Sequence, residues 1–428
     1  MRRKGRVVRL KKEKTAEKKK LLDLLFFFFL WLLYTAVTGW LFYHQANGNE
    51  HYFHSDIKAY MLEMQGLDSG YRFPYPILFR LGAVFLRFLS PQAAITASLT
   101  LLNSLSLLVT KYWFNRKLTT MEDGFGKRAF VSILTVSLFL ISMLFPVTGI
   151  KLPGIYGRYR GVFTPNPYHN ATYLAARPFS ILCFFEFAGL LEVYEEKSSF
   201  KEFPWKKGLC FGLFLLLATM TKPSFTLVLV ATAGILMVYR LIKSRFRNWQ
   251  VFLCLGICFI PTFCDLLYQF FGVFVPSSPE ENLSGQLLAD TAQSGIGIGF
   301  LTAWEKHCGN IPLAILLALA FPIVVLVFHA KDLKRNGTYR LSLQLLLVSL
   351  FTALFCYEKG FRLGDMNFSW GYMYGIFFAF VGAVMVLYRD TVRNPKKVLN
   401  WLQWLFYLWH LGCGLLYMKN FLAGYLYY

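Results

Sequence analysis

A carboxylate stands at the start of a polar stretch that follows a long apolar block. The block carries FFFFLWLLY (residues 26–34), and FHSDIKAYMLEMQGL (residues 53–67) follows with Asp56. Apolar side chains then recur at helical spacing, at Ile57, Tyr60, Met61, Met64 and Leu67. This pattern predicts a short helix lying flat at a membrane surface. Asp56 is placed to act as a general base; the alternative is a structural role, since either Ser55 or Asp56 is a natural N-cap for that helix.

Cationic side chains gather in the next long polar segment, GIKLPGIYGRYRGVFTPNPYHNATYLAARPF (residues 149–179), and in TMTKPSF (residues 219–225). Arginine suits phosphate because its planar group donates two parallel hydrogen bonds. A lysine beside a proline, between two short apolar segments, indicates a site within the membrane profile. We predict that Arg158, Arg160, Arg177 and Lys222 bind a phosphate or a lipid carrier. The alternative is that they only reach lipid headgroups.

A further polar segment, CYEKGFRLGDMNFSWGYMYG (residues 356–375), combines carboxylate, amide and aromatic groups. These groups suit the hydroxyls and apolar faces of sugars, although an interfacial loop with an aromatic belt has a similar composition. The candidate contacts with a sugar or an acceptor are Glu63, Tyr71, His169, Glu358, Arg362, Asp365, Asn367 and Trp370. We predict no metal site and no cofactor, because neither an acidic pair nor a zinc-type cysteine or histidine spacing is evident.

The composition indicates a membrane protein. Of the 428 residues, 56% are hydrophobic and only 16% are charged, whereas about a quarter are charged in a typical soluble domain. The apolar runs have about the length of ~20 residues that a bilayer-spanning helix needs. The predicted fold is therefore all-α and polytopic, with about eleven transmembrane helices (range about 9–13) and interfacial helices in the first external loop. The predicted segments are 21–43, 92–114, 129–148, 171–194, 208–221, 224–242, 250–274, 311–330, 341–356, 371–388 and 398–418.

Two parts of the chain are expected, a basic cytoplasmic tail (1–20) and a single transmembrane domain (21–428). Alternate connections hold most of the 45 lysines and arginines, which places those connections in the cytoplasm. The amino terminus is then cytoplasmic and the carboxyl terminus external. The external loops would be 44–75, 149–178, 275–310 and 357–370, and together they would form the face that carries the active site.

This topology accounts for the net charge of +22 without nucleic acid, which we exclude as a partner. The lipid bilayer is the expected environment. A bacterial plasma membrane is favoured because no retrieval or targeting signal is present.

The order of these parts resembles the GT-C superfamily of membrane glycosyltransferases, which use sugars linked to polyprenyl phosphate. The similarity covers roughly residues 21–225 and rests on the acidic residue after the first helix, on the aromatic and proline element FPYP (73–76), and on TKPS (221–224). It implies transfer of a sugar to an acceptor hydroxyl with inversion, in the synthesis of a cell-envelope glycan or glycoconjugate. Asp56 would be the general base, with Glu63 and Asp68 as substitutes.

In this scheme the cations would hold the departing phosphate without a metal. Two other classes remain open: a lipid-linked polysaccharide polymerase or ligase, and a lipid or glycan transporter (flippase). A membrane scaffold without enzymatic activity is a third.

Overall fold

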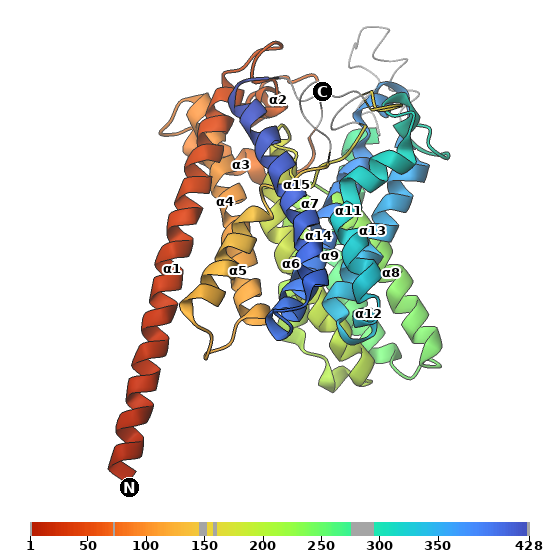
Figure 1. Ribbon diagram of the computed structural model, residues 1–428. Coiled ribbons are helices and arrows are strands. Elements are labelled where there is room, and N and C mark those ends of the chain that lie inside the picture. Colours follow the sequence, from red (N-terminus) through yellow and green to blue (C-terminus); the bar gives the residue numbers. More distant parts are fainter. Residues whose placement is uncertain (1, 72, 145–151, 157–160, 275–294, 426–428) are drawn as a thin grey trace.

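The computed structural model describes residues 2–71, 73–144, 152–156, 161–274 and 295–425. It is a bundle of helices with a single small pair of strands (Figure 1) among these residues. The helices are α1 (Arg2–Ala46), α2 (Ile57–Met64), α3 (Ile77–Phe85), α4 (Pro91–Leu118), α5 (Phe125–Ser137), α6 (Ala171–Glu196), α7 (Trp205–Thr221), α8 (Ser224–Lys243), α9 (Trp249–Phe274), α11 (Ile311–His329), α12 (Asp332–Arg335), α13 (Gly337–Phe355), α14 (Asn367–Arg393) and α15 (Val398–Leu422).

The remaining elements are short. Strands β1 (Ile296–Ile298) and β2 (Cys356–Glu358) pair antiparallel, with Gly297 opposite Tyr357. The 3₁₀ helices are η1 (Phe200–Glu202), η2 (Trp304–Lys306) and η3 (Gly360–Asp365).

The chain is an all-α polytopic membrane protein, as predicted, but the described residues contain eight helices that are long and apolar enough to cross a membrane. Fewer helices therefore qualify than the eleven segments predicted. The three segments that differ correspond to α5 with 13 residues, α7 with 17 residues, and α15. Helix α15 is long, but its apolar character is interrupted by Asn400, Gln403 and His410. The short apolar segment after FPYP forms α3, with nine residues.

The connections with many lysines and arginines gather at one end of the bundle. Helix α1 runs from the lower end of Figure 1 to the upper end, where α2 lies. The long helices that follow run in alternate directions between the two ends. Helix α12 lies at the lower end, whereas the last turn of α15 lies at the upper end (Figure 1). The polar segments that carry the candidate site residues are at the upper end, opposite the basic connections.

Helix α14 is the central helix, packed against α13, α11 and α8. Every residue from Ser369 to Tyr388 is buried, as expected for a helix that is apolar on all sides. Two glycines of α14 allow it to lie close to α13. A β-carbon added at Gly375 would lie 2.0 Å from Ser349 Oγ, and one added at Gly382 would lie 2.2 Å from Ser342 Oγ. Small residues at such spacing let two membrane helices approach closely.

A buried polar cluster joins α1 to α4 and α5. Lys111 Nζ lies 3.0 Å from Asp23 Oδ2 and 2.7 Å from Ser132 Oγ, and Ser132 also donates to Asp23 Oδ1 at 2.7 Å. A charge inside a membrane protein is costly unless it is paired. This ion pair therefore fixes how the first helix docks, and it lies away from the candidate site.

Candidate functional site

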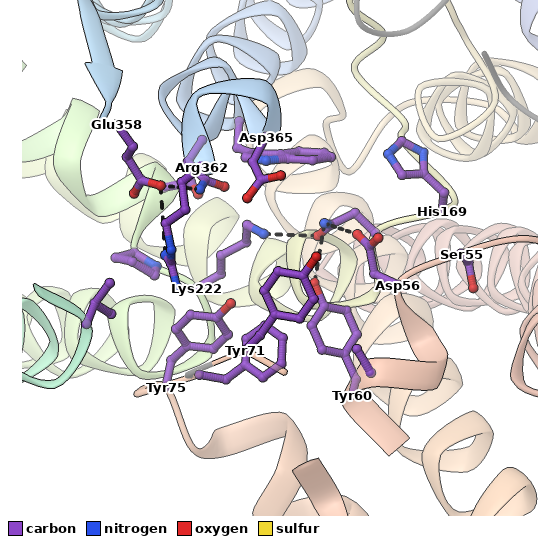
Figure 2. Close-up of a pocket in the computed structure, with 18 of the residues that line it drawn as sticks. Ser55, Asp56, Tyr60, Tyr71, Tyr75, His169, Lys222, Glu358, Arg362 and Asp365 are labelled. Atoms are coloured by element: carbon purple, nitrogen blue, oxygen red, sulfur yellow. Dashed lines mark hydrogen bonds and ion pairs between the residues drawn. The ribbon is translucent and has the colours of Figure 1, made fainter. Parts of the chain in front are cut away.

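A cavity of about 680 Å³ lies at the upper end of the bundle. Its walls come from segments that are far apart in sequence: the residues around α2, the FPYP element, the start of α6, the α7–α8 turn, the end of α9, and the β2–η3–α14 region. Figure 2 shows Lys222 near its centre, with Asp56 on one side and Glu358, Arg362 and Asp365 on the other.

The amino ends of four helices face this cavity. The wall includes Asp56 before α2, Asn170 before α6, Pro223 before α8 and Asn367 at the start of α14. At α8 and α14 the residue before the helix makes no side-chain cap, whereas the first N–H of α2, that of Ile57, donates to Ser55 Oγ at 3.3 Å. Backbone N–H groups and the helix dipole create positive potential at such an end. The cavity is therefore suited to a negatively charged group.

Asp56 points into the cavity instead of capping its helix. It occupies the N-cap position of α2 but makes no side-chain cap there, and its Oδ2 accepts a hydrogen bond from Asn170 Nδ2 at 2.7 Å. Its backbone N–H donates to the carbonyl of His169 at 3.2 Å, which holds α2 against the start of α6. Burial raises the pKa of Asp56, while Lys222 and the Asn170 hydrogen bond oppose that shift. A carboxylate with a raised pKa is a better proton acceptor than a fully solvated one.

Lys222 is the buried cation of the site. It follows α7 in the turn before α8, and only 6% of its surface is exposed. Its ammonium donates to Asn170 Oδ1 and to Thr172 Oγ1, each at 3.1 Å, and lies 4.8 Å from the centre of the Trp370 ring. Burial lowers the pKa of Lys222 to about 8, against the opposing influence of Asp56, Asp365 and Glu358. The lysine is therefore charged at neutral pH and loses its charge in the mildly alkaline range.

The opposite wall is built from β2, η3 and the start of α14. Glu358 Oε2 accepts a hydrogen bond from Asn367 Nδ2 at 2.6 Å and lies 3.8 Å from Arg362 Nη1. Burial raises the pKa of Glu358, opposed by the contacts with Asn367 and Arg362. This wall offers a carboxylate, a guanidinium and an amide to a ligand.

Aromatic rings form the floor between these two walls. Tyr71 stacks on Phe73 with ring centres 5.9 Å apart, and Tyr60 meets Phe73 edge to face at 5.1 Å. Tyr71 keeps 49% of its surface exposed, and both it and Tyr75 line the cavity (Figure 2). Exposed aromatic faces suit the apolar face of a sugar ring.

Part of the cavity wall is apolar and comes from helices α8 and α9. Leu227 of α8 and Phe270 of α9 line the cavity, yet each keeps 43% of its surface exposed. Both residues belong to helices that are long and apolar enough to span a membrane. This part of the wall is suited to contact with the hydrocarbon chain of a ligand.

The structure brings together most of the predicted site residues. Those that line the cavity are Asp56, Tyr71, His169, Lys222, Glu358, Arg362, Asp365, Asn367 and Trp370. Glu63 lies on α2, partly exposed and outside the cavity wall. Arg158 and Arg160 lie outside the described residues.

Arg177 is in a different place from the one its predicted role requires. Its side chain is fully buried within the bundle, and its guanidinium lies 5.0 Å from the ring centre of Phe139 and 5.5 Å from that of Phe377. It donates to Asn166, a neighbouring buried residue. Because α6 carries this residue inward, past the start of the helix, the guanidinium packs among aromatic rings and does not line the cavity.

Sequence reasoning missed Asn170. Its amide contacts both Asp56 and Lys222, and its Oδ1 also caps α6 by accepting from the N–H of Tyr173 at 3.0 Å. A signal was available, because asparagine immediately before an apolar helical run is a typical N-cap. The signal predicts the cap, but only the tertiary structure reveals the two charged neighbours.

Comparisons with protein-family models and with curated proteins found no match to this chain.

Proposed function

We propose that the protein is a membrane glycosyltransferase that moves a sugar from a polyprenyl-phosphate carrier to an acceptor hydroxyl. The observation that carries the proposal is the shared cavity of Asp56 and Lys222, a carboxylate and a buried cation supplied by segments far apart in sequence. General-base catalysis needs the first group, and a phosphate leaving group needs the second.

The proposed reaction is a single displacement. Asp56 accepts the proton of the acceptor hydroxyl while that oxygen attacks the anomeric carbon of the sugar. The bond between this carbon and the phosphate oxygen breaks, and the phosphate leaves with the electron pair. Lys222 and the amino ends of α8 and α14 stabilise the negative charge that develops there. Attack from the side opposite the phosphate inverts the anomeric centre.

Arg362 is the cavity arginine available for this proposal among the described residues, in place of Arg177. It lies across the cavity from Asp56, on the same side as Glu358 (Figure 2). We assign the sugar to the space bounded by Tyr71, Glu358 and Asn367, where its hydroxyl groups meet carboxylate and amide partners, and the acceptor hydroxyl to the side of the cavity where Asp56 lies.

The apolar wall of the cavity supports a lipid-linked donor. A soluble nucleotide sugar has no hydrocarbon chain that would contact this wall. An isoprenoid chain could lie along Leu227 and Phe270 with its phosphate near Lys222. The cavity also lies at the end opposite the basic connections, and by the positive-inside rule we propose that it faces the exterior. A bacterial plasma membrane is the proposed location.

A transfer assay in reconstituted vesicles tests the proposal. Purified protein would be given radiolabelled polyprenyl-phosphate sugars and a membrane extract as the source of acceptor, and labelled product would be counted. We expect transfer by the wild type and by Glu63→Gln, a matched variant of a carboxylate on α2 that does not line the cavity. We expect transfer by Asp56→Asn to be about 10²–10⁴-fold slower.

Equal product from wild type and Asp56→Asn would refute the assignment of the base. Movement of the labelled lipid between leaflets without transfer would instead support a transporter. Growth of a polymer on the lipid carrier would support a polymerase or ligase.

A further inference from the structure

Asn170 lies between the two charged groups of the cavity. Its amide N–H donates to the carboxylate of Asp56 at 2.7 Å, and its amide oxygen accepts from the ammonium of Lys222 at 3.1 Å. Only 3% of the asparagine surface is exposed. The donor end of the amide thus meets the anion and the acceptor end meets the cation, the arrangement in which both contacts are favourable.

The amide keeps the two charges out of direct contact. Within the part of the chain that the structure describes, the side-chain hydrogen bonds of Asp56 and Lys222 run to Asn170 and Thr172 and not to each other. A direct ion pair would satisfy both charges internally. The carboxylate would then be a weaker base and the ammonium less available to an incoming anion.

Asn170 is itself held firmly. Its Oδ1 caps α6 through the N–H of Tyr173 at 3.0 Å and accepts from Thr172 Oγ1 at 3.1 Å. Its Nδ2 also lies 3.4 Å from the hydroxyl oxygen of Tyr60, which in turn lies 3.2 Å from Thr172 Oγ1. The side chain has several anchors on both α2 and α6, so its orientation is fixed by more than its two charged neighbours.

We propose that Asn170 is a positioning residue that separates Asp56 from Lys222, so that one remains a free base and the other a free phosphate ligand. The catalytic part of this inference rests on the proposed glycosyl transfer. The separation of the charges is a property of the empty protein, and it is measured without any substrate.

The variants are chosen so that the cap of α6 is retained. Serine, aspartate and asparagine are comparable N-cap residues. A role limited to capping therefore predicts that Asn170→Ser and Asn170→Asp resemble the wild type. The separation role predicts that serine, which is too short to bridge both groups, lets Lys222 move onto Asp56. It also predicts that aspartate, which cannot donate to Asp56 when ionised, disturbs the carboxylate directly.

The first measurement is the pH dependence of Lys222 acylation in the purified protein, quantified by mass spectrometry of the labelled peptide. For Asn170→Ser we expect the labelling midpoint to rise by at least about one pH unit, because direct pairing favours the charged lysine. The double variant Asn170→Ser with Asp56→Asn should return the midpoint towards the wild-type value. A midpoint in Asn170→Ser equal to that of the wild type would overturn the inference.

The second measurement is the pH profile of kcat/KM for transfer. Asn170→Asp should move the acidic limb to higher pH by about one unit or more, because a second carboxylate beside Asp56 disfavours its ionisation. An unchanged acidic limb would contradict the positioning role. Absence of transfer by the wild type with any donor would refute the proposed function instead, and the labelling result would still decide whether Asn170 separates the charges.

Discussion

The charge of Lys222 should set the alkaline limit of activity. Burial lowers the pKa of this lysine to about 8. The ammonium form then exceeds the neutral form by about ten to one at pH 7, and the ratio is reversed at pH 9, since one pH unit is a factor of ten. If the ammonium holds the departing phosphate, kcat/KM is level below pH 8 and falls about tenfold for each unit above it, because kcat/KM reports groups in the free enzyme.

Two substitutions separate the charge of Lys222 from its shape. Lys222→Met removes the cation and should lower kcat/KM by about 10²–10³-fold at pH 7, the usual effect of deleting one group that stabilises the transition-state charge. Lys222→Arg keeps a charge that does not titrate in this range, so that the alkaline limb near pH 8 should disappear even if the maximal rate is reduced. The exposed Lys419 of α15, which does not line the cavity, provides the control variant Lys419→Met.

The assay is transfer from polyprenyl-phosphate sugar in vesicles between pH 5 and 10, with initial rates at donor concentrations below KM. An alkaline limb that stays near pH 8 in Lys222→Arg would show that another group titrates there. Wild-type kcat/KM in Lys222→Met would refute the phosphate role altogether.

Three further outcomes test other parts of the structure. Asp56→Asn should lower kcat by about 10²–10⁴-fold while the KM for the donor changes little, and a rise in KM alone would contradict its role as base. Asp23→Asn should destabilise the protein by about 3–5 kcal/mol in thermal or denaturant unfolding, because Lys111 is left buried and unpaired. The double variant Asp23→Leu with Lys111→Leu should recover most of this loss. No recovery would show that the pair does not act as a unit. Gly375→Ala should lower the unfolding temperature, since its β-carbon would lie 2.0 Å from Ser349 Oγ. Adding Ser349→Ala in the same chain should restore part of the lost unfolding temperature. An unfolding temperature that is unchanged in Gly375→Ala would mean that α13 and α14 can separate freely.

Much of the fold was predictable because a bilayer imposes strong rules on sequence. A buried helix must satisfy its own backbone, so apolar length alone identified most of the spans, including the central segment that forms α14. The prediction was weakest at α5, α7 and α15. There, short helices and polar side chains that find partners inside the bundle depart from the simple apolar pattern.

The candidate site was predictable in its parts but not in its connections. Residue type and predicted side of the membrane selected Asp56, Lys222 and Glu358. Charged groups in or beside a membrane are costly, so they often mark a functional site. The same reasoning selected Arg177, whose guanidinium the structure places among aromatic rings in the bundle. Sequence spacing does not report which way a helical side chain points relative to a cavity built by other helices.

By itself, the sequence determined that the chain is a helical membrane protein and that its basic connections gather at one end, since hydrophobic length and charge are properties of each segment alone. Only the tertiary structure decided that the Asp56 side chain faces a cavity and does not cap its helix, and that Asn170 lies between it and Lys222. Those contacts join α2, α6 and the α7–α8 turn, and their distances depend on how the helices pack. No local pattern of residues encodes them.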